Sequence, residues 1–135
     1  MAVLHGKDCD HNFNSVALDA ALRSIDVAVD VDLPDASACG DSAKETLPGM
    51  YGWTMDADYL WNPAVSENDV TIQAQIGGAG VTVDVTPGGG AATATNPKYS
   101  GTGHVKSYRI SVPHDGMITS RCSYQGDGAL SRIVV

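Results

Sequence analysis

The chain has 135 residues, 43% of them apolar, so it is long enough to enclose a core within one domain spanning residues 1–135. Sixteen acidic residues against eight basic ones give a net charge of −8, which disfavours a protein that grips nucleic acid. No apolar run is long enough to span a membrane, and residues 1–8 lack the apolar stretch of a secretory signal, so folding in a cytoplasm is expected.

The first predicted elements are weakly marked. Residues 2–4 predict a short edge strand, and residues 6–14 are polar and turn-like. In residues 16–23, the spacing of Val16, Leu18 and Leu22 fits either a strand or one helical turn. Both alternatives stay open.

Residues 24–32 alternate strictly between two kinds of side chain. One face carries Ile25, Val27, Val29 and Val31, and the other carries Asp26, Ala28, Asp30 and Asp32. This period of two, with β-branched residues, predicts a half-buried strand. The polar face of this strand is almost purely anionic, which is unusual.

A long loop follows at residues 33–52, where proline and glycine recur and no periodicity is sustained. Loops longer than about 12–15 residues are uncommon in compact domains and usually have a function. We therefore expect this loop to make a contact outside its own domain.

Residues 53–61 alternate again and predict a second strand. Its apolar face carries Trp53, Met55, Ala57, Tyr59 and Trp61, and its other face carries Thr54, Asp56, Asp58 and Leu60. If the two strands pair as a hairpin, five aspartates gather on one side of the sheet and Leu60 lies near a rim or a contact. The predicted core is made of Ile25, Val27, Val29, Val31, Trp53, Met55, Tyr59 and Trp61, packed against Val81, Val83 and Val85.

The next segment, residues 63–76, is ambiguous. Asn62-Pro63 and the acids Glu67 and Asp69 favour the start of a helix that ends at Gly77. The alternation of Val70, Ile72, Ala74 and Ile76 also suits a strand, so periodicity alone leaves both open.

The remaining chain predicts short strands separated by turns. Strands are expected at residues 81–85, 104–112, 117–124 and 129–135, with an extended, mobile stretch at residues 91–103. Turns are marked by glycine and proline at residues 86–90, 113–116 and 125–128. The sequence therefore predicts a mainly β chain.

Few residues suggest chemistry. Cys9, Cys39 and Cys122 are odd in number and far apart, which argues against a disulfide framework. Cys9-Asp10-His11 resembles part of a metal site but lacks a second ligand pair. The glycine-rich stretches at residues 77–80 and 88–90 are not followed by Lys-Ser/Thr, and no nucleophile motif occurs. We expect no catalytic residue, no metal and no cofactor, and so a structural protein rather than an enzyme.

An ordered set of short motifs resembles the tail tube proteins of long-tailed bacteriophages. The set comprises residues 6–8, 12–16, 23–27, 99–101, 107–113, 115–116 and 126–128. The most specific part is Asp-Ala-Ser-Ala-Cys-Gly-Asp-Ser-Ala-Lys-Glu-Thr-Leu-Pro-Gly at residues 35–49, which resembles the family's Asp-x-Thr-x-Phe-Gly-Asp-x-x-Lys-x-x-Ile-Pro-Gly. The chain departs from it at Ser37, where the family prefers Thr, and at Cys39, where it prefers Phe.

The resemblance implies two packed antiparallel β-sheets with one flanking helix near residues 64–76. Subunits would form hexameric rings that stack into a tube for ejection of viral DNA, assembled in the host cytoplasm and placed in the virion tail. The partners implied are further copies of the chain and the tape measure, terminator and distal tail proteins, with DNA passing through but not bound, and no membrane.

Combined with the alternation, the resemblance yields two site predictions. The acids Asp26, Asp30, Asp32, Asp56 and Asp58 should face the channel or its rim, where they would repel the phosphates of passing DNA. The long loop should contact a neighbouring subunit through Leu33, Pro34, Asp35, Lys44, Leu47 and Pro48. The alternatives are a capsid decoration or adhesin-like β-sandwich, which would form no tubes, and the tube subunit of a gene-transfer or injection particle.

Overall fold

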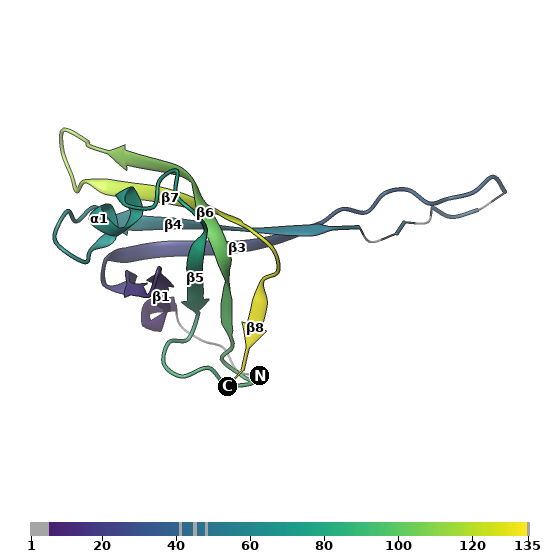
Figure 1. Cartoon of the computed structure of the whole chain (residues 1–135), viewed down its shortest axis with the longest axis horizontal. Coiled ribbons are helices and arrows are strands. Elements are labelled where there is room, and N and C mark those ends of the chain that lie inside the picture. Colours follow the sequence, from purple (N-terminus) through teal and green to yellow (C-terminus); the bar gives the residue numbers. More distant parts are fainter. Residues whose placement is uncertain (1–5, 41, 45, 48, 135) are drawn as a thin grey trace.

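The computed structural model describes residues 6–40, 42–44, 46–47 and 49–134, and they form a sheet-rich body with a long projecting arm (Figure 1). The strands are β1 (Asp10–Phe13), β2 (Val16–Ala17), β3 (Leu22–Val31), β4 (Tyr51–Leu60), β5 (Val81–Thr86), β6 (Lys98–Ser111), β7 (Thr119–Gly126) and β8 (Ser131–Ile133). The helices are the α-helix α1 (Asn68–Gln73) and the two 3-10 turns η1 (Gly6–Asp8) and η2 (Asp19–Ala21).

All described strands belong to one antiparallel sheet in the order β2-β1-β5-β6-β7-β4-β3, with β8 also paired to β6. The mainly β class with one α-helix is confirmed, but the two separate sheets expected from the sequence are joined. The long strand β6 joins them, because it pairs with β5 through residues 99–103 and with β7 through residues 103–111. Figure 1 shows β5 and β8 running across the direction of β3 and β4, so the single sheet is bent into two halves.

The strands flanking the long loop form as their alternation predicts. β3 and β4 pair in register from Ile25 opposite Ala57 to Val31 opposite Tyr51. Since successive side chains of a strand point to opposite faces, buried positions of β4 alternate with partly exposed ones from Gly52 to Leu60. A register shift lies between Leu22 and Ser24, at the end of the hairpin farthest from the arm.

The helix is shorter than the expected span of residues 64–76, and the strand alternative for this segment is excluded. Ser66 has a positive φ of 63° and Glu67 is extended, so helical geometry begins only at Asn68. The buried Asn68 side chain donates to the Leu60 carbonyl at 2.8 Å, which ties the start of α1 to the end of β4. Gly77, at φ 75°, ends the turns that follow the helix.

Other segments also differ from expectation. Residues 10–13 form β1 instead of a turn, and residues 16–23 contain both a short strand and a 3-10 turn before β3 begins. Residues 98–103, expected to be mobile, are the first part of β6, where β5 supplies the hydrogen-bonding partner that the sequence did not reveal. The strand expected at residues 129–135 is limited to β8, and the one expected at residues 2–4 lies outside the described residues.

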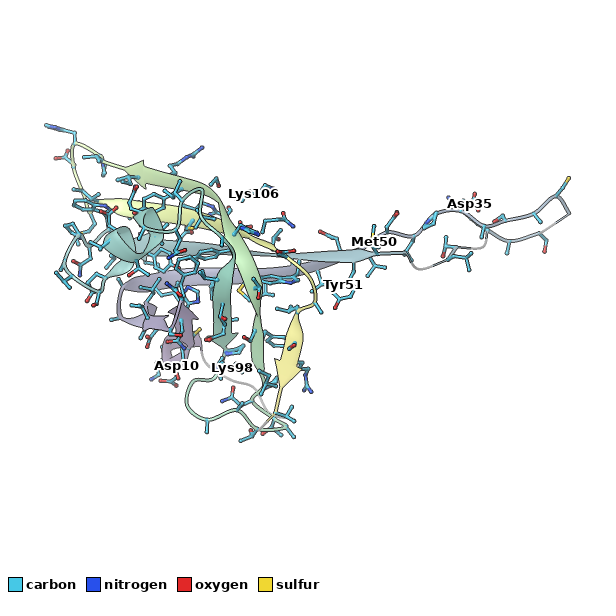
Figure 2. All side chains as sticks on the ribbon, in the orientation of Figure 1. Asp10, Asp35, Met50, Tyr51, Lys98 and Lys106 are labelled. Atoms are coloured by element: carbon cyan, nitrogen blue, oxygen red, sulfur yellow. The ribbon has the colours of Figure 1, made fainter. Side chains whose placement is uncertain are left out.

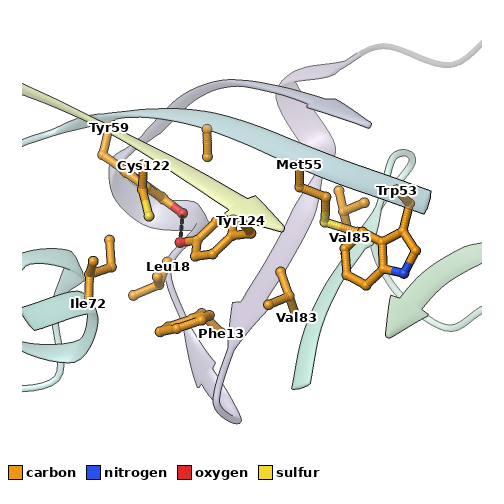
Figure 3. Close-up of a cluster of buried hydrophobic side chains, with 11 residues drawn as sticks. Phe13, Leu18, Trp53, Met55, Tyr59, Ile72, Val83, Val85, Cys122 and Tyr124 are labelled. Atoms are coloured by element: carbon orange, nitrogen blue, oxygen red, sulfur yellow. Dashed lines mark hydrogen bonds between the residues drawn. The ribbon is translucent and has the colours of Figure 1, made fainter. Parts of the chain in front are cut away.

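The hydrophobic core lies in the angle between the two halves of the sheet (Figure 3). It comprises Phe13, Leu18, Trp53, Met55, Ala57, Tyr59, Ile72, Val83, Val85, Cys122 and Tyr124. Trp53 occupies the bend, where Gly101 and Gly126 leave room for its indole ring, since a Cβ at either glycine would overlap the ring. The absence of side chains at these glycines therefore lets the two halves approach each other.

A chain of buried polar groups also crosses this core. His11 accepts a hydrogen bond from the Tyr59 hydroxyl at 2.6 Å through Nε2, because its Nδ1 donates to the Asp84 carbonyl at 2.8 Å. The hydroxyl oxygens of Tyr59 and Tyr124 are 2.8 Å apart and continue the chain. Burial lowers the pKa of His11, and burial raises the pKa values of the two tyrosines.

Candidate functional site

The predicted core residues divide into buried and exposed groups. Trp53, Met55 and Tyr59 are buried, while Ile25 and Trp61 are partly buried. The prediction is wrong for Val27, Val29 and Val31, which are 37%, 49% and 46% exposed.

The physical reason is the position of β3 at the edge of the sheet, where β4 is its one partner among the strands that the structure describes. The apolar face of β3 therefore extends past the layer that covers β4. It opens into a groove of about 780 Å³, whose apolar lining includes Ile25, Val27, Val29, Val85, Tyr99 and Leu130.

The five predicted acids lie on one face of the β3–β4 hairpin, opposite the core. Asp26 pairs directly with Asp56, and Asp58 pairs with Ser24 in the same set of alternate positions. Asp30 and Asp32 continue this face toward the arm. Asp26, Asp30 and Asp32 are exposed, whereas Asp56 and Asp58 are partly covered by their neighbours.

Two of these acids are held by groups on β7. The Ser123 hydroxyl donates to Asp56 Oδ1 at 2.6 Å, and Arg121 Nη1 lies 3.2 Å from Asp58 Oδ1. Ser24 also donates its hydroxyl to Asp58, at 3.1 Å. These contacts keep both carboxylates directed along the sheet surface.

The same face continues across β7 to β6, where its charge changes sign. Arg121 pairs with Asp58 on one side and with Arg109 on the other, so both arginines share the face of the aspartates. Exposed Lys106 and His104 also lie on β6, with Lys106 at a register shift. The sequence did not predict that these bases share the face of the aspartates. Their common face follows from the pairing of β6 with β7 and of β7 with β4, which joins residues far apart in the chain.

The neighbouring strands β6, β7, β4 and β3 form a four-stranded part of the sheet, which has an unpaired edge on each side. Among the described strands, β3 pairs only with β4, so its other edge has no partner there along Leu22–Val31. On β6, the edge opposite β7 is covered by β5 only as far as residue 103, so residues 104–111 have no strand partner there among the described residues. Unpaired edges of this length are normally blocked or paired with another chain.

The loop between β3 and β4 is an extended arm that leaves the body at the opposite end from α1 (Figure 1). Its two sides meet at an Asp35–Thr46 bridge, at a hydrogen bond from Leu47 N to Pro34 O of 3.1 Å, and at one from Gly49 N to Asp32 O of 2.6 Å. Figure 2 shows Asp35 on the projecting arm, beyond Met50 and Tyr51 at its base.

The arm exposes apolar side chains with no core of its own. Leu33 is 55%, Leu47 62% and Met50 88% exposed. Pro34 and Lys44 are also exposed, whereas Pro48 lies outside the described residues. The Ser37 amide donates to the Asp35 carboxylate, which lowers the pKa of Asp35.

The possible metal ligands are not arranged as a metal site. Among the described residues, no three His, Cys, Asp or Glu side chains are grouped as a metal site. Both ring nitrogens of His11 are engaged within the core, and Cys9, Cys39 and Cys122 are free thiols. Burial raises the pKa of Cys122 to about 12, so its thiol stays protonated at neutral pH. None of the described helices is long and apolar enough to cross a membrane.

No family model matches the chain, and no curated protein matches it in sequence. Its fold, in contrast, is similar to those of several solved assemblies. A chain of the virion of a native gene transfer agent particle aligns with a TM-score of 0.80 at 17% identity, covering 98% of this chain and 100% of the other.

Two further solved structures also have a similar fold at low sequence identity. A chain of the tail of an empty gene transfer agent particle, with C6 symmetry, aligns with a TM-score of 0.78 at 17% identity over 98% and 100% of the two chains. The SPP1 tail tube aligns with a TM-score of 0.75 at 12% identity over 98% of this chain and 81% of the other. The chain therefore has the fold of these tail proteins.

Proposed function

We propose that this chain is the major tail tube subunit of a virion, and that copies of it form hexameric rings stacked into a hollow tube. The observation that carries the proposal is the four-stranded part of the sheet, formed by β3, β4, β7 and β6, which has two open edges and one mostly polar face. Rotation of copies about an axis can join such edges and remove them, and the joined sheets then form a barrel. The C6 symmetry of the similar gene transfer agent tail supports the same arrangement.

The polar face is assigned to the channel. It carries the five aspartates Asp26, Asp30, Asp32, Asp56 and Asp58, while the opposite face carries the core. An acidic wall repels the phosphates of DNA at short range and releases no counterions to hold it, so DNA would pass without adhering.

The arm is assigned to contacts between rings. It projects from one end of the hairpin and exposes Leu33, Leu47 and Met50 to solvent in the isolated chain. Burial of these side chains against another copy would stabilise stacking by removing apolar surface from water. The role is structural and not catalytic, and the tape measure, terminator and distal tail proteins are the further partners that this role implies.

The proposed role is the same in a bacteriophage and in a gene-transfer particle. The likeness to both SPP1 and gene transfer agent tails is consistent with either, because a tube subunit performs the same task in each. The host cytoplasm is the proposed place of assembly, and the virion tail the final location.

Negative-stain electron microscopy of the purified chain tests this proposal across a range of protein concentrations. Hollow tubes or six-fold rings are expected at high concentration. A chain that remains monomeric in sedimentation under all conditions would instead favour the decoration or adhesin-like alternative.

A further inference from the structure

The proposed barrel joins the β3 edge of one copy to the β6 edge of the next. We infer that Asp26 and Asp30 on β3 form ion pairs with Lys106 and Arg109 on β6 of the neighbouring copy, and that these pairs fix the assembly. This inference rests on the proposed ring, and it names the strands and side chains that join the copies. "Seam" here means the contact between Leu22–Val31 of one copy and residues 104–111 of its neighbour.

Strand direction permits this seam. β3, β4, β7 and β6 are linked by three antiparallel pairings, so β3 and β6 run in opposite directions within one copy. Rotation about a ring axis does not reverse a strand relative to that axis. β3 of one copy therefore meets β6 of the next in antiparallel orientation, and the alternation continues around the ring without a break.

Charge also matches across the seam. On the polar face, β3 carries Asp26 and Asp30, which make no ion pair among the described residues. The β6 edge carries exposed Arg109, on that same face, and exposed Lys106 at the bulge, and both likewise lack an ion pair there. Opposite charges on neighbouring strands stabilise pairing, and like charges directly opposite destabilise it.

The apolar face is also complementary at these two edges. Val27 and Val29 on β3 lie on the core side yet are exposed, and Ile110 on β6, on the same side, is 42% exposed. Joining the edges would place these side chains side by side on the outer surface of the barrel wall. The groove beside β3 would then be covered by the neighbouring copy rather than by solvent.

The seam accounts for the arginines on a face assigned to the channel. Arg121 is neutralised within its own copy by Asp58, at 3.2 Å. Among the described residues of its own copy, Arg109 has no such partner, and the seam supplies it with the acids of the next copy. The assembled wall then presents acids in excess and no unpaired arginine to passing phosphate.

Two charge-reversed variants test the seam. The first, Asp26→Lys/Asp30→Lys, makes both edges basic, and the second, Lys106→Glu/Arg109→Glu, makes both edges acidic. Each alone should raise the subunit concentration needed for assembly by about tenfold or more, because every seam then opposes like charges. Circular dichroism should show that each variant remains folded.

An equimolar mixture of the two variants gives the sharpest readout. The basic β3 edge of the first matches the acidic β6 edge of the second, and the native edges of the two also match each other. Rings with the two variants in strict alternation should therefore form, since a six-membered ring accommodates alternation. A single chain carrying all four substitutions should also assemble.

The variant Asp8→Lys/Asp115→Lys is the control for the first variant, since it changes the net charge by the same amount at exposed positions that lie on neither β3 nor β6. It should assemble as the wild type does. Assembly of either seam variant alone at the wild-type concentration, or failure of the mixture, would overturn the seam and leave the tube standing. A wild-type chain that never assembles would overturn both.

Discussion

At the scale of single residues, the contact between Trp53 and its glycine neighbours holds the bend of the sheet. The indole is 1% exposed and rests against Gly101 and Gly126. We expect Trp53→Ala to lower the free energy of unfolding by about 3–5 kcal/mol, as for other large buried aromatic residues. Urea denaturation would measure this loss, and the partly exposed Trp61 should lose less when replaced by alanine.

The glycines provide a control for this interpretation. Gly126→Ala should destabilise the wild type by about 1–3 kcal/mol, because the added methyl group overlaps the indole. In the Trp53→Ala background the same substitution should cost much less, since the ring is gone. Equal costs in both backgrounds would show that Gly126 is required for its backbone conformation rather than for space.

His11 gives the core a dependence on pH. Its pKa is lowered in the folded chain by burial, while the unfolded chain binds a proton at about pH 6.5. Between the two pKa values the unfolded state binds more protons, so stability is complete above about pH 6.5 and falls as the pH decreases below it. Denaturation between about pH 5 and 8 should show this slope, above the range in which most carboxylates titrate.

Two substitutions separate His11 from the other groups. His11→Gln should remove the slope between about pH 6.5 and 5, whatever its effect on absolute stability. His114→Gln should leave the slope unchanged, because His114 is exposed in the turn between β6 and β7. A slope that persists without His11 would assign it to another group.

At the scale of elements, the arm can be separated from the body. Asp32 and Gly49 are already hydrogen-bonded across the base of the arm, so an Asn-Gly turn can replace residues 33–48. The shortened chain should fold with nearly unchanged stability and form rings, but these rings should not stack. Tubes of normal length from this variant, seen by electron microscopy, would show that the arm does not join the rings.

The arm has a milder variant as its control. Leu33→Ser/Leu47→Ser keeps the backbone of the arm and removes two exposed apolar side chains. If burial of these residues stabilises stacking, tubes should be shorter and should need more protein to form. Unchanged tubes would leave backbone or polar contacts as the source of any stacking energy.

The β3–β4 hairpin could be predicted from the sequence because alternation there is strict, and the five aspartates therefore fall on one face as expected. Burial could not be predicted in the same way. Val27 has the same local pattern as Met55, its partner, yet only Met55 lies beneath the crossing half of the sheet. Local periodicity identifies the face of a strand, but the strand's position in the sheet decides whether that face is covered.

The helix and β6 show a second limit. Spacing within residues 63–76 fits both a helix and a strand, and α1 begins only after Ser66, whose positive φ no glycine in the sequence indicates. Residues 98–103 resembled a loop because they are small and polar, and they became a strand through long-range pairing with β5. The bases Arg109 and Arg121 were missed for the same reason, since their common face depends on partners distant in the sequence.

At the scale of the whole molecule, the acidic face should keep DNA from adhering. In wild-type tubes, short double-stranded DNA should not co-sediment with the protein, since five aspartates outnumber the two arginines on each copy's polar face. Asp56→Asn/Asp58→Asn tubes should retain DNA at low salt, because Arg121 loses its partner and two charges of repulsion are removed.

The salt dependence of this DNA retention tests whether the arginines hold the DNA by its phosphates. Binding to the exposed arginines should weaken steeply as salt increases, because counterions are released when phosphate binds. If wild-type and Asp56→Asn/Asp58→Asn tubes bind DNA equally, or if neither binds it, Asp56 and Asp58 do not govern the passage of DNA through the channel.

The length of β6 has a mechanical consequence. One continuous backbone passes from the half that contains β5 to the half that contains β3, β4 and β7, and Trp53 fills the angle between them. Neither half can tilt without straining the strand or displacing the indole. In a stack of such subunits, a displacement of the half that contains β3, β4 and β7 would therefore move the half that contains β5 as well, because β6 connects the two without a flexible linker.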